Sequence, residues 1–359
     1  MSAQLGRIAR LLRLEPGELQ GLDDVPDADL RILHDQISRT LFAEGQRRFA
    51  RVAGLSKTIP GPLAGVLAVK FLPPVMAARV SENLDPAKAR DLIGRVPIAY
   101  LAEIALALDP VRSKPVVQKL PPEPIGKVAK ELFGRGEYAT MAEFVGTVTV
   151  EALFAALHVA TPHDLLAVVP LLEWNDNLDK VIAELPEAQV RDIATALDAE
   201  ELADLALALD PSRMGPIVAA VPVEVIAGIA SALFERREYA AMAAFVGVVT
   251  PEMLHTALGV ATAADLLAVV PLLEWSGAID GVVDTLPDAT LDGLFAEIAG
   301  GADWEAAKAA FERLSPTAQQ RLFARFDRLS KTNQKRIREA ADAGELGQAA
   351  AELMAGSAA

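Results

Sequence analysis

The sequence predicts an all-α protein made of a row of short stacked helices. Residues 101–187 reappear almost without gaps as residues 202–288, and each residue has its counterpart 101 positions later, as Asp109 and Asp210 show. Within each copy apolar residues recur at helical spacing, and joints rich in Pro and Asp return about every twelve residues. A long period built from smaller units is typical of an α-solenoid. No stretch of useful length alternates apolar and polar residues as a strand would.

Residues 1–71 are expected to form a helical N-terminal extension. One long helix is predicted from about Asp29 to Val52, because apolar residues recur on one of its sides. These residues are Leu30, Leu33, Ile37, Leu41, Phe42 and Phe49. The stretch from Ile59 to Pro74 contains several Pro and Gly residues, which interrupt helices. We therefore expect it to be a connector to the first stacked helix.

Residues 72–299 are expected to form the solenoid itself. The sequence predicts helix breaks at Asp85-Pro86, Asp109-Pro110, Pro186 and Asp210-Pro211. An Asp side chain can accept hydrogen bonds from the first free N–H groups of a helix, and Pro fits the first helical turn. The same Pro disfavours helical geometry in the residue before it, so one helix ends where the next begins. Helices this short are marginal alone and must pack against neighbours.

Residues 300–359 are expected to form a charged C-terminal extension. The pair Gly300-Gly301 marks a break after the solenoid. Two helices are predicted after it, over about Trp304–Leu314 and about Pro316–Ala341. A tail rich in small residues follows from Gly344 and is expected to be partly disordered.

The composition limits the class of protein. Apolar residues make up 52% of the 359 residues and aromatic residues only 5%, and the mean hydropathy is +0.28. Such an excess of Ala, Leu and Val fits helices that are buried on more than one side. Because the chain has no Cys, disulfides and thiolate metal sites are excluded. No apolar stretch reaches the ~18 to 20 residues of a membrane span, and no signal peptide is recognisable, so a cytoplasmic location is expected.

The charge is negative overall but unevenly placed. The net charge is −15 and the pI is about 4.8, which disfavours extended binding to nucleic acid. Basic residues gather near the two ends, between Arg7 and Arg51 and between Arg321 and Arg338. These segments are either solvated helix faces or surfaces that dock onto an acidic partner or an anionic membrane.

Residues 72–133 resemble the cytoplasmic N-terminal domain of the MgtE magnesium transporters. The resemblance is carried by the run LPPVMAARVSENLDPAKARDLIGRVPIAYLAEIALALDPVRSKPVVQKLPPEPIGKVAKELF and extends to about Glu297. It implies a right-handed superhelix of short helices whose acidic surface takes part in Mg²⁺-dependent gating. This sequence shows neither the paired CBS domains nor the membrane-spanning region that follow the module in the transporters. The resemblance therefore implies sensing or interaction, and not transport by this chain alone.

Three acidic residues are the candidate metal ligands. Glu173, Asp176 and Asp179 are spaced three residues apart, which places them near one face of a continuous helix. Carboxylate oxygens suit Mg²⁺, so weak Mg²⁺ binding is one interpretation. In the other, a new helix begins near Trp174, and Asp176 lies in its first turn, where the helix dipole favours a negative charge. No other cofactor is predicted.

A second set of residues could line a cavity for a hydrophobic ligand. The aromatic residues recur in both copies, and His158 is the histidine with the strongest case for a function because its counterpart is Gly259. The candidates are Trp174, Trp275, Tyr138, Tyr239, Phe144, Phe245 and His158. Packing at the edge of the core explains the same aromatic residues without any ligand. His158 and His163 are expected to lie on separate helices because Thr161-Pro162 breaks the helix between them.

The sequence therefore favours a non-catalytic interaction or sensing scaffold with an unknown protein partner. It contains no phosphate-binding loop, nucleophile elbow or dinucleotide fingerprint, and so gives no sign of a named enzyme. One alternative is a binding protein for, or an enzyme acting on, a lipid or isoprenoid held in an apolar cavity. A second alternative is a peripheral protein that docks on a membrane surface through its basic terminal helices.

Overall fold

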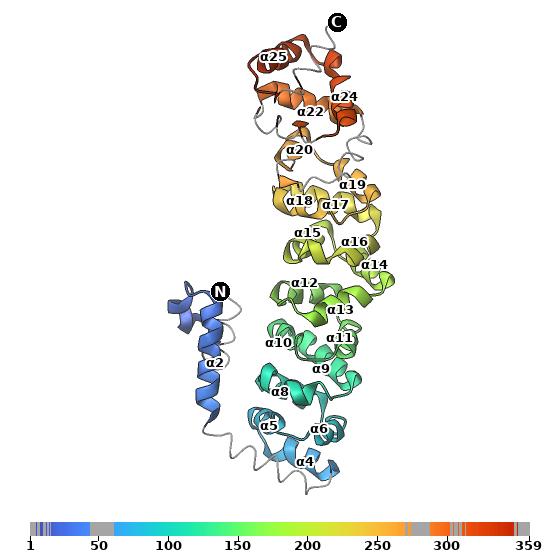
Figure 1. Cartoon of the computed structure of the whole chain (residues 1–359). Helices are drawn as coiled ribbons and strands as arrows, with labels where there is room; N and C mark the ends of the chain where they lie inside the picture. The colour runs from blue at the N-terminus through green and yellow to red at the C-terminus, as the bar shows by residue number, and fades with distance from the viewer. Residues whose placement is uncertain are drawn as a thin grey trace. The chain divides into compact units, whose positions relative to one another are not determined.

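The computed structural model describes residues 16–43, 61–269, 272–273, 288–301 and 314–347, together with isolated residues between and beyond these ranges. All regular elements of the described residues are α-helices or short 3-10 helices (Figure 1). The all-α prediction is thus confirmed. By contacts the chain divides into two compact units, residues 1–181 and residues 182–359. The predicted division at residues 71 and 299 stays a prediction.

The first unit consists of short helices separated by tight joints. Its elements, through the helix that ends it, are η1 (Pro16–Leu22), α2 (Asp27–Ala43), α4 (Gly61–Phe71), α5 (Pro74–Ser81), α6 (Pro86–Ile93), α7 (Ile98–Ala107), α8 (Pro110–Val117), α9 (Pro122–Gly134), α10 (Tyr138–Phe144), α11 (Val150–Leu157), α12 (Pro162–Val168), η2 (Val169–Leu171) and α13 (Asp176–Glu184). Alternate helices pack on one another: α5 on α7, α7 on α9 and α9 on α11, with α4, α6 and α8 in a second series.

The second unit repeats this plan. Its elements are α14 (Glu187–Ala196), α15 (Ala199–Ala208), η3 (Pro211–Arg213), α16 (Gly215–Ala220), α17 (Val223–Glu235), α18 (Tyr239–Val246), α19 (Pro251–Leu258), α20 (Ala263–Val269), α22 (Asp288–Gly301), α24 (Pro316–Phe323), η5 (Phe326–Arg328) and α25 (Lys331–Asp342). Here α15 packs on α17 and α17 on α19, while α18, α20, α22 and α25 form another series.

The core of each unit is a series of small clusters rather than one centre. Ala77, Ala78 and Ile104 form one such cluster between α5 and α7. Ala194, Leu197 and Leu202 form another in the second unit. This is the arrangement expected when each helix pair contacts only its neighbours in a stack.

The predicted joints are confirmed, and their capping chemistry is visible. The carboxylate of Asp109 accepts hydrogen bonds from the backbone N–H groups of Val111 and Arg112, both at 3.0 Å. Asp85 caps α6 in the same way through the N–H of Ala87. Asp210 also caps, but the element that it begins is the 3-10 helix η3 instead of an α-helix.

Two expectations for the extensions were wrong. Residues 61–71, expected within a connector, form helix α4, because Pro62 lies in the first turn, where a missing N–H group is harmless. The long helix predicted over 316–341 is interrupted after Phe323 and begins again at Lys331, where Ser330 caps the N–H of Asn333. The first long helix ends its described part at Ala43, and the predicted remainder to Val52 lies outside the described residues.

The end of the longest repeat helix has the same geometry in both units. After α9 the N–H of Glu137 donates to the carbonyl of Leu132 and the N–H of Gly136 to that of Phe133, which together form a Schellman motif. Glu238 and Arg237 make the corresponding bonds after α17. The left-handed position is Gly136 (φ 70°) in the first unit but Arg237 (φ 59°) in the second.

Candidate functional site

Tyr138, a ligand-lining candidate, is engaged in a contact between helices. Its hydroxyl donates to the Asp164 carboxylate at 3.2 Å, from the start of α10 to the first turn of α12. The other oxygen of Asp164 accepts from the backbone N–H (2.8 Å) and the hydroxyl (2.7 Å) of Thr161, and the N–H of Asp164 donates back to that hydroxyl. Tyr138 therefore fastens α10 to a reciprocal capping box.

The second unit contains the same arrangement at the counterpart residues. The Tyr239 hydroxyl donates to Asp265 at 3.1 Å, and Asp265 accepts from the N–H (3.0 Å) and hydroxyl (2.6 Å) of Thr262. The contact thus holds helices together in both copies, which favours packing over ligand binding as the reason that these tyrosines recur.

The capping box also changes the acidity of its members in the first unit. Partial burial acts to raise the pKa of the Asp164 carboxyl, but the hydrogen bonds from Thr161 and Tyr138 together lower it below its ordinary value. Burial, and then the hydrogen bond to Asp164, raise the pKa of the Tyr138 hydroxyl. Both shifts keep Asp164 ionised and Tyr138 protonated near neutral pH, so the bond between them persists there.

An arginine at the end of each long repeat helix joins two helices through ion pairs. Arg135 contacts Glu103 of α7 at 2.5 Å and Glu131 of its own helix at 2.8 Å. Its counterpart Arg236 contacts Asp204 of α15 at 2.6 Å and also pairs with Glu200. Glu103 and Asp204 occupy equivalent positions in the two copies, whereas Glu131 and Glu200 do not. The ion pairs between helices are thus made by partly different residues.

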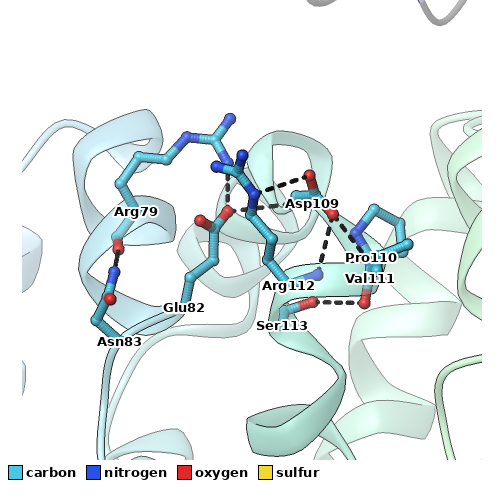
Figure 2. A network of polar contacts seen from close by, with 8 residues as sticks. All are labelled: Arg79, Glu82, Asn83, Asp109, Pro110, Val111, Arg112 and Ser113. Carbon is cyan, nitrogen blue, oxygen red and sulfur yellow. Dashed lines mark hydrogen bonds and ion pairs between the residues drawn. The ribbon is translucent and has the colours of Figure 1, made fainter. Parts of the chain in front are cut away.

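The polar network drawn in Figure 2 lies between α5 and α8 in the first unit. Arg79 pairs with Glu82, and both side chains are more than nine-tenths buried, at 8% and 6% exposed. Glu82 also accepts the backbone N–H of Asp109 at 3.2 Å, and Asp109 in turn lies 3.6 Å from the Arg112 guanidinium. Two arginines and two carboxylates thus connect the end of α5 to the cap of α8.

The charges of the two arginines and two carboxylates sum to zero, and their contacts serve to hold α5 and α8 together. Burial raises the pKa of the Glu82 carboxyl, although the charge of Arg79 and the N–H of Asp109 act in the opposite direction. Removing one member of a buried ion pair leaves the other charge without compensation, which is costly. The sequence analysis did not find this network, because Glu82 and Asp109 are 27 residues apart and only packing brings them together.

The other ligand-lining candidates occupy different surroundings. Phe144 packs against the buried cluster of Val117, Val148 and Ala152. Phe245 is half-buried at the end of α18, and His158 is exposed at the end of α11. Trp174 is 36% exposed between η2 and α13, and its counterpart Trp275 lies outside the described residues. His158 and His163 lie on either side of the predicted break at Thr161-Pro162, which is confirmed.

The candidate metal ligands lie at the start of α13, which supports the helix-dipole interpretation. Asn175 caps this helix by accepting from the N–H groups of Asn177 (3.0 Å) and Leu178 (3.3 Å). Asp176 and Asp179 are therefore in the first turn, while Glu173 precedes the helix. Among the residues that the structure describes, no three His, Cys, Asp or Glu side chains are grouped to hold a metal. Weak Mg²⁺ binding stays a prediction.

Asn177 is a second residue that the sequence analysis did not find. Its amide donates to the carbonyls of Val145 (3.2 Å) and Val148 (2.9 Å), and so ties α13 to the turn before α11. An Asn inside a helix next to two acidic residues looks like part of a polar surface. Its role depends on the turn that packs against it, which the local sequence does not reveal.

The comparisons with known proteins do not place this chain in a family. No family model, no curated protein and no solved structure matches it. These comparisons therefore do not support the resemblance to the MgtE N-terminal domain. In the described part of the chain no helix is both long and apolar enough to cross a membrane.

Proposed function

We propose that this protein is a non-catalytic interaction or sensing scaffold, similar in kind to the MgtE N-terminal domain. The observation that carries the proposal is a run repeated in the sequence, near whose end an apolar side chain is exposed in each unit. The run DLLAVVPLLEW occurs at residues 164–174 and again at 265–275. Near its end Trp174 is 36% exposed in the first unit and Leu272 is 50% exposed in the second. The two are not counterparts: Leu171, which corresponds to Leu272, is half-buried, and Trp275 lies outside the described residues.

The chemistry of these exposed side chains fits partner binding better than catalysis. Trp is enriched among the residues that dominate the energy of protein interfaces, because it buries a large area with few rotatable bonds. The polar side chains that recur, Tyr138 and Arg135 among them, are engaged with neighbouring helices. Trp174 and Leu272, the exposed apolar side chains near the end of the run, form the surface that we propose for a partner.

The duplication also bears on the kind of partner. Each unit carries one copy of the run, so the proposal gives one chain two related sites. If a partner contains two equivalent segments, simultaneous binding raises the overall affinity without any new contact. We expect a partner with repeated or paired apolar segments.

Site-specific photo-crosslinking in the native cells tests this proposal. A photoreactive benzoylphenylalanine at position 174 should give a defined covalent adduct with a protein partner, and position 272 should give an adduct with the same protein. Position 111 is the matched control, since Val111 is 78% exposed but lies outside the repeated run. Adducts at 174 and 272 that are no more abundant than at 111 would contradict the proposal.

Binding of a hydrophobic small molecule is the second candidate, and the apolar composition favours it. The aliphatic excess allows an apolar pocket as well as a dry core. Native mass spectrometry of a detergent-free preparation distinguishes the two candidates. A stoichiometric lipid or isoprenoid adduct supports ligand binding, whereas a protein of unmodified mass supports the scaffold.

A further inference from the structure

Over residues 65–71, the part of helix α4 whose burial is described, the large apolar side chains are exposed and the small residues are buried or half-buried. Val66 and Phe71 are 63% and 66% exposed, and Leu67 and Val69 are exposed as well. At about 100° per residue these four side chains fall on one continuous side of the helix. Gly65 is buried on the other side, and Ala68 beside it is half-buried. A helix that serves only the core has the reverse arrangement.

The small side of α4 is firmly attached to the rest of the first unit. The hydroxyl of Tyr100 on α7 donates its one hydrogen to the carbonyl of Leu72 at 2.6 Å, with the carbonyl of Ala68 also within reach at 3.1 Å, and α4 packs on α6. A Cβ atom at Gly65 would lie 3.5 Å from the Cβ atom of Arg95, so the two backbones are close. The exposed side is therefore held in a fixed orientation by contacts on the opposite side.

The next helix along the chain adds two exposed apolar side chains. Val75 and Met76, in the first turn of α5, are also exposed. We call these six residues the α4–α5 apolar face, which consists of Val66, Leu67, Val69, Phe71, Val75 and Met76. Lys70 is the one charged residue of α4, and its ammonium nitrogen lies 5.5 Å from the centre of the Phe71 ring.

The sequence around this face is free of negative charge. Residues 45–81 contain no Asp or Glu, although the chain has 49 of them in 359 residues and a net charge of −15. The basic residues in this window are Arg47, Arg48, Arg51, Lys57, Lys70 and Arg79, of which Arg79 is buried in its ion pair with Glu82 and is not available to a partner. A positive segment is thus joined covalently to an exposed apolar helix in a protein that is otherwise acidic.

We propose that the α4–α5 apolar face binds the surface of a bilayer that contains anionic lipids. The apolar side chains enter the boundary between headgroups and acyl chains, and the basic residues are attracted to the lipid charge. Lys70 can keep its charge among the headgroups while its methylene groups stay with Phe71. The rest of the chain is negative in sum and is repelled by the same surface, which favours approach with a positive segment first.

A second copy of the chain fits this face less well than a membrane does. Two copies joined through it would bring two Lys70 side chains toward each other, and like charges repel. An anionic membrane supplies both properties that the face requires, an apolar layer and a negative surface. The inference does not depend on the proposed scaffold function, because it concerns α4 and α5 and not the repeated run.

Vesicle flotation of the full chain tests the inference. The parent should float with vesicles in which roughly a third of the lipid is phosphatidylglycerol, should bind phosphatidylcholine vesicles weakly, and should detach as salt is raised. The double variant Val66→Ser, Phe71→Ser should lower binding by at least about tenfold. Val111→Ser, a change at a valine on α8 that is even more exposed than Val66 (78% against 63%), should leave binding unchanged. Circular dichroism verifies that each variant keeps its helices.

Three results would overturn it. They are the absence of parental binding to the anionic vesicles, equal binding by the double variant, and equal binding to vesicles of phosphatidylcholine alone. Light scattering after gel filtration adds a separate check on the second-copy interpretation. A parental dimer that becomes monomeric in the double variant would show that the face joins two copies, and would also overturn the proposal.

Discussion

At the scale of single residues, the duplicated helix end offers a direct comparison of Gly with Arg. Gly136 and Arg237 hold the same left-handed position after α9 and α17. An L-residue pays about 1–2 kcal/mol for this geometry, and Gly does not. Arg237→Gly should therefore stabilise the protein by about 0.5–1 kcal/mol after allowance for the greater freedom of Gly in the unfolded chain. Urea unfolding measures the change, and Gly136→Ala is the control that should destabilise.

Asp109 and Asp210 are counterparts with the same capping role but different burial. The Asp109 side chain is 17% exposed and accepts two backbone N–H groups, whereas Asp210 is 41% exposed and caps only a 3-10 helix. Replacing Asp109 with Ala should cost about 1–2 kcal/mol and replacing Asp210 about 0.5–1 kcal/mol. Equal urea midpoints for the parent and both variants would show that neither residue contributes as a cap.

The Asp164 capping box should make stability depend on pH in a predictable direction. The pKa of the Asp164 carboxyl is lowered in the folded state. Its contribution to stability is therefore fully present above the ordinary carboxyl pKa and is lost as the pH falls through the folded pKa. Asp164→Ala should cost about 1 kcal/mol near neutral pH, and the difference from the parent should shrink near pH 3. A cost that stays constant between these two pH values would contradict this assignment.

At the scale of elements, the packing of α9 on α11 depends on the absence of a side chain at Gly126. A Cβ atom there would lie 2.9 Å from the carbonyl oxygen of Ala155, and that backbone atom cannot easily move aside. Gly126→Ala should therefore destabilise by about 1–3 kcal/mol. Gly134→Ala, in the same helix but with no atom within 4 Å, is the control and should be neutral or slightly stabilising. Thermal unfolding of the two variants compares them.

The elements that the sequence predicted are those fixed by local chemistry. The breaks at Asp85-Pro86 and Asp109-Pro110 follow from capping and from the geometry of Pro, which involve only neighbouring residues. Helix α4 was missed because its Pro62 suggested a break, although the same residue type begins the helices α6 and α8. The contact of Glu82 with Asp109 was missed for another reason. It depends on how two helices pack, which no local pattern encodes.

At the scale of the whole molecule, the two copies have kept contacts more strictly than residues. The pair Tyr138–Asp164 and its counterpart Tyr239–Asp265 are unchanged, while the partners of Arg135 and Arg236 differ in part. The sequence could identify the duplication from identical runs. It could not tell which identical residues hold helices together and which ones, such as Trp174, are exposed.

The remaining prediction for the whole molecule concerns Mg²⁺, the ligand that the resemblance to MgtE implies. A ligand bound only by the folded state stabilises that state by RT ln(1 + [L]/Kd), and the melting temperature rises as a result. Added salt also relieves repulsion in a chain of charge −15, so MgCl₂ must be compared with NaCl at the same ionic strength. Because Asp176 and Asp179 lie in the first turn of α13, where the helix dipole already stabilises them, we expect no shift specific to Mg²⁺.

A shift specific to Mg²⁺ would overturn this expectation only if it depends on these carboxylates. The double variant Asp176→Asn, Asp179→Asn removes two carboxylates and leaves Asn175, which caps the helix through Asn177 and Leu178, in place. Loss of the shift in this variant would assign a cation site to α13 and favour sensing over simple scaffolding. Persistence of the shift would place the cation elsewhere on the acidic surface, because the dominant oxygen ligands for Mg²⁺ would then be other carboxylates.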